Sequence, residues 1–207
     1  MNRSANAITG SCEQPSLGCR PTFSHVIDRK RVAVYDGLLP GATLKSLCDV
    51  VSRAAYTRSE SARPDTAQFR HWATEISLAA LPTMPFMAPT LHALEDFDGI
   101  GYRPYRSYVN VAHFGDVLLS HVDCLPGAGE ITALWYVCEQ WDRDWGGETV
   151  FFDVHNEARA LVTPKPGRLV LFDGDLLHTG KPPNRNCYQA RYTLALKFER
   201  AARPAAT

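Results

Sequence analysis

The sequence predicts a mainly β fold with flanking helices, of the jelly-roll kind, and three observations support this. Eight short, β-rich segments follow one another between residues 105 and 198. Turn residues separate them, such as Pro126-Gly127 and Pro166-Gly167. Two segments with helical spacing precede them. Many short strands with frequent turns are typical of sandwiches and barrels, so we expect the helices on one outer face.

The N-terminal part predicts one strand and two helices. Residues 1–28 are rich in Ser, Asn, Pro and Gly without periodicity, which predicts a mobile leader. The segment RVAVYDGLL (31–39) has the composition of a strand. Apolar residues recur at helical spacing over 41–56, and a second helix is expected over 86–97. The polar, irregular segment between them, SESARPDTAQFRHW (59–72), predicts a surface loop.

The C-terminal half consists of the eight predicted strands, all rich in β-branched, aromatic or leucine residues. They are YRSYVNVAHF, DVLLSHV, ITALWYVCE, ETVFFD, ARALVT, GRLVLFD, DLLHTG and YQARYTLALKF. The sequence shows no internal repeat, and it ends on AARPAAT. We therefore predict one domain over 29–200 and a short tail over 201–207.

Composition and charge exclude several classes of protein. The chain of 207 residues has 22 basic and 22 acidic residues, and a neutral balance argues against a nucleic-acid partner. No apolar run approaches the roughly 18 residues of a membrane-spanning helix, and the N-terminus lacks the apolar core of a secretory signal. The six cysteines include no CxxC pair, so we expect reduced thiols and a cytoplasmic location, with a disulfide framework as the alternative.

Three residues have the spacing of a metal site. His121 and Asp123 lie two residues apart at the end of a predicted strand, so their side chains share one face. His178 follows at the end of another apolar segment. Two imidazoles and one carboxylate can form a facial triad, which leaves the opposite face of an octahedral metal open. This arrangement is typical of non-heme Fe(II) oxygenases. A pair of strand-end residues in ordinary hydrogen bonds is the alternative.

Arg191 is the candidate for anchoring a carboxylate. It begins the last predicted strand, and alternation places Thr193 and Lys197 on the same face. A guanidinium suits a carboxylate because it offers a planar fork of donors. Thr193 can add a hydroxyl contact, while Lys197 either reaches the cavity or extends outward. Arg185 is a rival anchor, but it lies in a turn, where a side chain is less well aimed.

These segments together resemble the iron- and 2-oxoglutarate-dependent dioxygenases of the prolyl 4-hydroxylase type. The motifs are HVD (121–123), WDRDWGGETVFFD (141–153), PKPGRLVLFDGDLLHTG (164–180) and RYTLALKF (191–198). FGDVLLSHVD with ITALWYV and WDRDWGG is most similar to the catalytic domain of the ribosomal-protein prolyl hydroxylases. The similarity covers roughly residues 103 to 199.

The resemblance implies a double-stranded β-helix, cupin-like, with Fe(II) held by His121, Asp123 and His178. It further implies 2-oxoglutarate and O₂ as co-substrates, with ascorbate as a candidate stimulant, and places the distal carboxylate of 2-oxoglutarate on Arg191. Tyr136 matches a family tyrosine that contacts 2-oxoglutarate. A second family tyrosine is replaced by Ala112, and Asn110 nearby is the candidate substitute.

The presence of Asp123 implies hydroxylation rather than halogenation, because related halogenases have a small residue at this position. The implied overall reaction converts 2-oxoglutarate to succinate and CO₂ while an unactivated C–H bond is oxidised. Substrate contacts are open; the candidates are Arg106, His113 and Trp145. The compact chain favours a small molecule, or an amino-acid or peptide substrate, over a protein prolyl residue, which is the alternative.

Two other classes remain open from the residues. A cupin-type metal enzyme without 2-oxoglutarate would not need Arg191. A non-enzymatic jelly-roll binding module would not need two histidines and an aspartate at strand ends. The sequence does not define the carbon oxidised, and fold analogy does not extend to a substrate.

Overall fold

The computed structural model describes residues 20–99 and 101–201. The strands are β1 (Phe23–Ile27), β2 (Lys30–Tyr35), β3 (Thr57–Glu60), β4 (His71–Glu75), β5 (Tyr102–Ala112), β6 (Ile131–Tyr136), β7 (Thr149–Phe152), β8 (Ala158–Val162), β9 (Leu169–Asp173), β10 (His178–Gly180) and β11 (Arg191–Arg200). The α-helices are α1 (Gly41–Arg53) and α2 (Met87–Asp98), and short 3₁₀ turns are η1 (Pro64–Thr66), η2 (Leu78–Thr83) and η3 (Arg143–Trp145).

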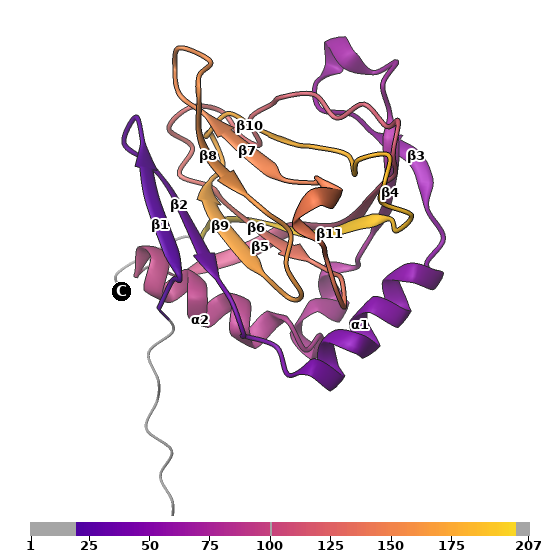
Figure 1. The fold of residues 1–207 in the computed structure, drawn as a ribbon. Coiled ribbons are helices and arrows are strands. Elements are labelled where there is room, and N and C mark those ends of the chain that lie inside the picture. The colour runs from indigo at the N-terminus through magenta and orange to yellow at the C-terminus, as the bar shows by residue number, and fades with distance from the viewer. Residues whose placement is uncertain (1–19, 100, 202–207) are drawn as a thin grey trace, which may run out of the picture.

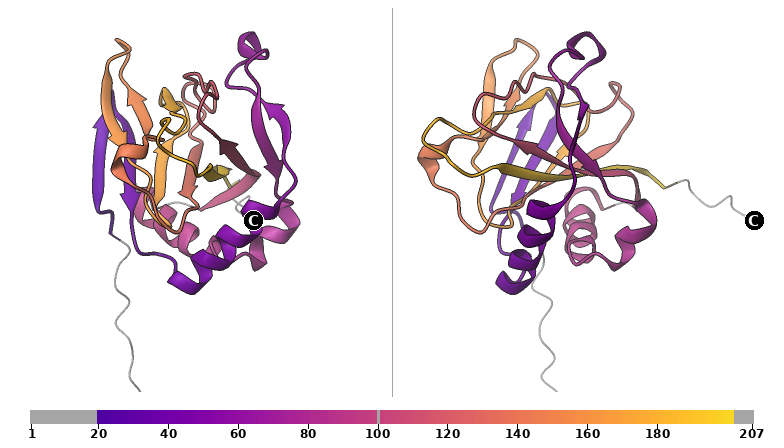
Figure 2. Two further views of the ribbon diagram at one scale, coloured as in Figure 1. Left: turned by 45° about the vertical axis from the view of Figure 1, so that its right-hand side comes forward. Right: turned by 90° about the vertical axis from the view of Figure 1, so that its right-hand side faces the viewer.

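The strands form two antiparallel sheets, as Figure 1 shows. The larger has eight strands in the order β1-β2-β9-β6-β11-β5-β4-β3, and the smaller has three in the order β10-β7-β8. Both helices lie together at one end of the molecule in Figure 2, with the strands extending away from them. The predicted mainly β jelly roll with helices on one side is therefore confirmed.

The two helices cover one face of the larger sheet through an apolar core. In α1 the buried residues Leu44, Leu47 and Val51 recur every three or four positions, which places them on one side of the helix. In α2 the Thr90 hydroxyl accepts a hydrogen bond of 2.9 Å from the fully buried indole of Trp135 on β6. The helices thus cover the outer face of the larger sheet. Its inner face is turned toward the smaller sheet.

A second apolar core lies between the two sheets. Phe151 on β7 packs edge-on against Phe172 on β9, with ring centroids 5.1 Å apart. Val162 on β8 and Val170 on β9 belong to the same buried cluster. Alternation along each strand sends every second side chain into this interior.

The register of β11 against its neighbours positions the polar residues of the interior. Arg191 lies opposite Ala112 of β5, and Lys197 lies opposite Thr132 of β6. Directly paired residues share a face of the sheet. Arg191 and Lys197 therefore lie six residues apart along one face.

Three sequence-based boundaries differ from the structure. The leader predicted to residue 28 contains β1, which pairs with β2 from Phe23 to Ile27; the part before residue 20 lies outside the described residues. The predicted loop 59–72 contains the end of β3 and the start of β4. The predicted strand 116–122 is a loop that pairs only through an isolated bridge between His121 and His178.

The first two differences have a physical reason, which is the position of β1 and β3 in the larger sheet. β1 and β3 are the two edges of the larger sheet, and most of their residues are exposed. Edge strands carry exposed polar residues and lack a clear alternating pattern.

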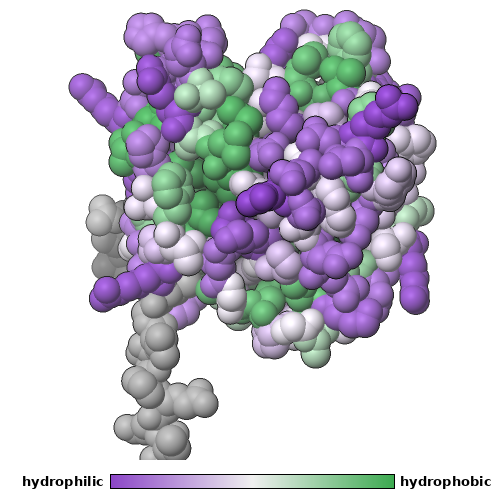
Figure 3. All heavy atoms as spheres, in the orientation of Figure 1, coloured by the Kyte–Doolittle hydropathy of each residue, from purple (hydrophilic) through white to green (hydrophobic). Residues whose placement is uncertain are grey.

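The face in Figure 3 is mixed, with apolar side chains gathered in its left half. Within the described ranges, no helix is long and apolar enough to cross a membrane.

Candidate active site

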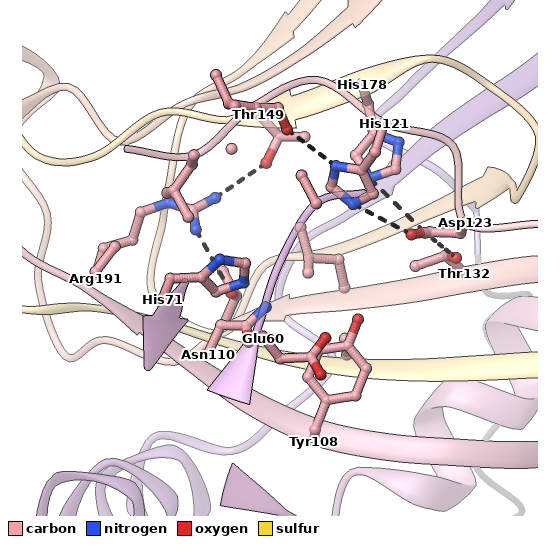
Figure 4. Close-up of a pocket in the computed structure, with 18 of the residues that line it drawn as sticks. Glu60, His71, Tyr108, Asn110, His121, Asp123, Thr132, Thr149, His178 and Arg191 are labelled. Atoms are coloured by element: carbon pink, nitrogen blue, oxygen red, sulfur yellow. Dashed lines mark hydrogen bonds and ion pairs between the residues drawn. The ribbon is translucent and has the colours of Figure 1, made fainter. Parts of the chain in front are cut away.

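A pocket lies between the two sheets and is lined by both. The smaller sheet contributes Thr149 and His178, and the larger sheet contributes Asn110, Leu134 and Thr193. Figure 4 shows His121, His178 and Asp123 together on one side of this pocket and Arg191 on the other. The predicted metal residues and the predicted anchor thus share one cavity.

The three predicted metal residues converge as expected. One possible ligand atom from each of His121, Asp123 and His178 lies within 4.8 Å of the others. The backbones of the two histidines are joined directly, since each N–H donates to the other's carbonyl at 2.9 and 3.0 Å. The sequence can only place these residues at strand ends. The antiparallel bridge brings the two segments together although they are 57 residues apart.

Hydrogen bonds orient both imidazoles for metal binding. Nδ1 of His121 lies 3.1 Å from the carbonyl of Leu119, and Nδ1 of His178 lies 2.9 Å from that of Leu176. A carbonyl only accepts, so each Nδ1 carries the proton and donates. In each ring Nε2 is then the nitrogen left for a metal, which is the usual arrangement for a metal-ligating histidine.

The charge state of the three residues also suits a divalent metal. Burial lowers the pKa of His178 to about 4, so its imidazole is neutral at pH 7. Burial alone would raise the pKa of Asp123, but the ammonium of Lys197 and the two neighbouring histidines together hold that pKa well below its ordinary value. The site therefore offers two imidazole nitrogens and one carboxylate, the donor set of a facial triad. This donor chemistry fits Fe(II).

Arg191 is buried at the opposite end of the pocket, with 4% of its surface exposed. Its Nε donates to the carbonyl of Gly147 at 2.6 Å, and Nη2 donates to the hydroxyl of Thr149 at 3.1 Å. Nη1 lies 3.5 Å from the hydroxyl of Thr193. These contacts fix the guanidinium without a carboxylate partner among the described residues. The rival anchor, Arg185, is exposed.

Two glycines allow the guanidinium to lie where it does. Gly147 has φ +81°, and a Cβ there would lie 2.8 Å from a ring carbon of Trp141 and 3.3 Å from Cδ of Arg191. A Cβ on Gly180 would lie 3.3 Å from both terminal nitrogens of the same arginine. Only glycine adopts the first conformation without strain, so the Gly-Gly turn seen in the sequence also makes room for the anchor.

The structure places two of the other three predicted co-substrate residues in the pocket and one behind its wall. Thr193 and Asn110 line the pocket, and the amide oxygen of Asn110 is buried without a hydrogen-bond partner among the described residues. Tyr136 lies behind the wall, where its hydroxyl pairs with the Thr149 hydroxyl at 2.7 Å and donates to the Val162 carbonyl at 3.0 Å. It therefore supports Thr149 and the guanidinium, whose Cζ lies 5.2 Å from the tyrosine ring centroid.

The three candidate substrate contacts are not among the described residues that line the pocket. Arg106 lies beside it, with one terminal nitrogen 2.6 Å from both Glu60 and Glu75. The side chain of His113 is 60% exposed. Trp145 packs edge-on against Trp141.

The pocket wall includes residues that sequence reasoning missed. Glu60 and His71 come from the hairpin that the sequence predicted as a loop, and they are paired across β3 and β4. Burial lowers the pKa of His71. Thr132 was missed too, although alternation from Tyr136 gives a signal for it, since it lies four residues away on the same strand. Lys197 also lines the wall, so of the two directions that the sequence left open it takes the one toward the cavity.

Comparison with known proteins identifies the class of this site. Residues 107–198 match the family model described as the 2OG-Fe(II) oxygenase superfamily. Residues 107–198 are a 2OG-Fe(II) oxygenase domain. The three metal-site residues and Arg191 all lie within it. This domain is that of a 2-oxoglutarate-dependent dioxygenase, and the matched family uses Fe(II), 2-oxoglutarate and O₂.

Solved structures share the fold of this oxygenase at low sequence identity. A prolyl-4-hydroxylase from Pseudomonas putida has 17% identity and a TM-score of 0.58, over 83% of this chain and 93% of that chain. A prolyl hydroxylase from Trichoplax adhaerens, in complex with a hypoxia inducible factor peptide fragment, has 15% identity and a TM-score of 0.57, over 82% and 83%. The epimerase SnoN from nogalamycin biosynthesis has 13% identity and a TM-score of 0.62, over 82% and 76%.

This likeness supports the fold and does not extend to a substrate. A comparison with curated proteins finds no match. The predicted 2OG-Fe(II) oxygenase class is confirmed by the family model, and the likeness to prolyl hydroxylases is one of fold.

Proposed function

We propose that the protein hydroxylates an unactivated C–H bond of a small molecule, or of an amino-acid or peptide substrate. The overall reaction consumes one 2-oxoglutarate and one O₂; one oxygen atom enters the new hydroxyl group and the other enters succinate, with release of CO₂. In this proposal His121, Asp123 and His178 hold Fe(II), which supplies the activation of O₂. Arg191 holds the distal carboxylate of 2-oxoglutarate, assisted by Thr193 and Thr149.

One observation carries this proposal. A three-residue metal site and a buried guanidinium without a carboxylate partner lie at opposite ends of one pocket. A dicarboxylate that chelates a metal at one end needs a cation at the other. A buried charge is costly unless it is paired, so a guanidinium kept in this position favours an anionic ligand. A cupin-type enzyme without 2-oxoglutarate would have no such need.

The substrate side is the open part of the proposal. Ser61 and Ala62 after β3, and Leu118 and Leu119 before His121, line the pocket beside the metal site. We propose that the substrate enters between these two segments. A prolyl residue of a protein is the alternative substrate, supported by the fold likeness to prolyl hydroxylases. Asn110 remains the candidate for a further co-substrate contact.

The proposal extends to the organisation and location of the chain. We propose one catalytic domain that contains both sheets and both helices, without a nucleic-acid or membrane partner. A cytoplasmic location is supported by the free thiols of Cys48, Cys124, Cys138 and Cys187. Ascorbate is the candidate stimulant of turnover, and adding it to the succinate assay tests this.

Succinate formation tests the proposed function. Protein loaded anaerobically with Fe(II) and then given 2-oxoglutarate and O₂ should form succinate slowly even without its substrate. His178→Ala should abolish this turnover because it removes one metal ligand, whereas His92→Ala, which alters an exposed histidine on α2, should retain it. Equal turnover in both variants, or none in the wild type, would contradict the assignment. Amino acids, prolyl peptides and metabolites can then be screened for stimulation.

A further inference from the structure

Lys197 is a buried cation next to the metal site. It lies on β11, six residues after Arg191 on the same face, and only 7% of its surface is exposed. Its ammonium forms a short ion pair with Oδ2 of Asp123 and donates to the hydroxyl of Thr132 at 3.1 Å.

The two oxygens of the Asp123 carboxylate have different surroundings. Oδ2 accepts from the Thr132 hydroxyl at 2.6 Å as well as from Lys197. Oδ1 faces Nε2 of His121 at a distance of 3.4 Å. Because that nitrogen is the one that the His121 ring offers to a metal, Oδ1 faces the space where a metal would lie. Two donors thus hold one oxygen and leave the other available.

The ammonium is fixed by the sheet itself. Lys197 and Thr132 are directly paired across β11 and β6. On the other side, the ammonium lies 5.9 Å from the ring centroid of Tyr108 on β5, and the guanidinium of Arg106 lies over the same ring at 4.3 Å. Lys197 therefore lies in the pocket wall, with its ammonium held on Asp123 and Thr132.

We propose that Lys197 is a positioning residue that holds Asp123 as a one-oxygen ligand and attracts an anionic co-substrate to the metal end of the pocket. This inference rests on the proposed function. In that function Arg191 pairs the distal carboxylate of 2-oxoglutarate, while the ammonium of Lys197 lies beside Asp123 at the metal end. An ammonium in this position attracts a dianion and repels a divalent cation. Lys197 therefore favours binding of the dianion more than binding of the metal.

The test compares binding of the metal with binding of 2-oxoglutarate. Calorimetry measures Mn(II) binding to the apoprotein, and then 2-oxoglutarate binding to the Mn(II)-loaded protein. In Lys197→Met we expect the dissociation constant of 2-oxoglutarate to rise at least tenfold. That of Mn(II) should change less than threefold, because loss of the anchor and loss of a repelling cation act in opposite directions. Lys45→Met, in an exposed lysine of α1, is the matched control and should change neither constant.

Two further variants separate charge from hydrogen bonding. Lys197→Gln keeps a polar donor without the charge, and should lose 2-oxoglutarate affinity as Lys197→Met does. Thr132→Val keeps the charge and removes one donor to Oδ2. We expect it to weaken Mn(II) binding and to leave the dissociation constant of 2-oxoglutarate on the Mn(II)-loaded protein within threefold of the wild type. A purely structural role for Lys197 would instead lower the melting temperature and both affinities together.

The outcomes distinguish this inference from the proposed function. If the wild type does not bind 2-oxoglutarate in the presence of Mn(II), the proposed function fails. If the wild type binds it and the two Lys197 variants bind within threefold of the wild type, the proposed role of Lys197 is wrong. If circular dichroism shows that Lys197→Met does not fold, Lys197→Gln gives the same decision.

Discussion

Replacement of Arg191 by lysine tests the proposed anchor for the distal carboxylate of 2-oxoglutarate. A guanidinium has five N–H donors. Three of them are directed at Gly147, Thr149 and Thr193, which leaves two for a ligand. Two parallel bonds match a carboxylate held in a bidentate manner. Lysine keeps the charge, but its ammonium cannot reproduce this fork.

The expected magnitude follows from the loss of one of these two bonds. A hydrogen bond to a charged group contributes about 1.5–3 kcal/mol, and about 1.4 kcal/mol corresponds to a factor of ten. Arg191→Lys should therefore raise KM for 2-oxoglutarate by about 30-fold. The distal carboxylate does not react, so kcat at saturating 2-oxoglutarate should stay within about threefold of the wild type.

The assay is succinate formation at a series of 2-oxoglutarate concentrations. Arg185→Lys, in an exposed arginine of the preceding turn, is the control and should leave KM unchanged. Unchanged KM in Arg191→Lys, or a fall in kcat alone, would refute the placement of the distal carboxylate on Arg191.

Two further predictions concern stability. Asp36 accepts two hydrogen bonds of 2.8 Å from Arg168, and these bonds lower the pKa of Asp36. Asp36→Asn should therefore lower the free energy of unfolding by about 1 kcal/mol at pH 7, as measured by urea unfolding. This difference from the wild type is present above about pH 4 and is lost as the pH falls through the pKa of Asp36 in the folded protein. Thr90→Val leaves the buried indole N–H of Trp135 without its acceptor, and should lower the free energy of unfolding by about 2 kcal/mol; an unchanged midpoint of unfolding would show that the bond contributes nothing.

The sequence was sufficient for the strands of the interior and insufficient for those at the edges. The segments 131–137 and 169–172 are almost continuously apolar, and both form central strands of the larger sheet. β3 has no buried residue, so its four residues carry no pattern. It forms because β4 offers a paired edge, a contact that depends on the tertiary structure. Glu60 was therefore assigned to a loop although it lines the pocket.

The substrate candidates show the same limit in the site. Arg106, His113 and Trp145 were chosen for their residue type and their closeness along the chain to the motifs. Arg106 alternates with Tyr108 and lies on the side of the pocket, but two carboxylates take up its guanidinium. The other two lie in a turn and in a 3₁₀ segment. Sequence spacing does not reveal which cations are already paired.

The sequence by itself determined the chemistry of the metal site. Two histidines and an aspartate at strand ends, with an arginine at the start of the last strand, define the donor set whatever the details of packing. Only the tertiary structure decided how that set is arranged. Antiparallel pairing joins His121 to His178, burial makes the pKa of His178 low, and the register of β11 on β6 brings Lys197 to Asp123. These are long-range contacts, and alternation along a strand specifies a face but not the residue that lies across from it.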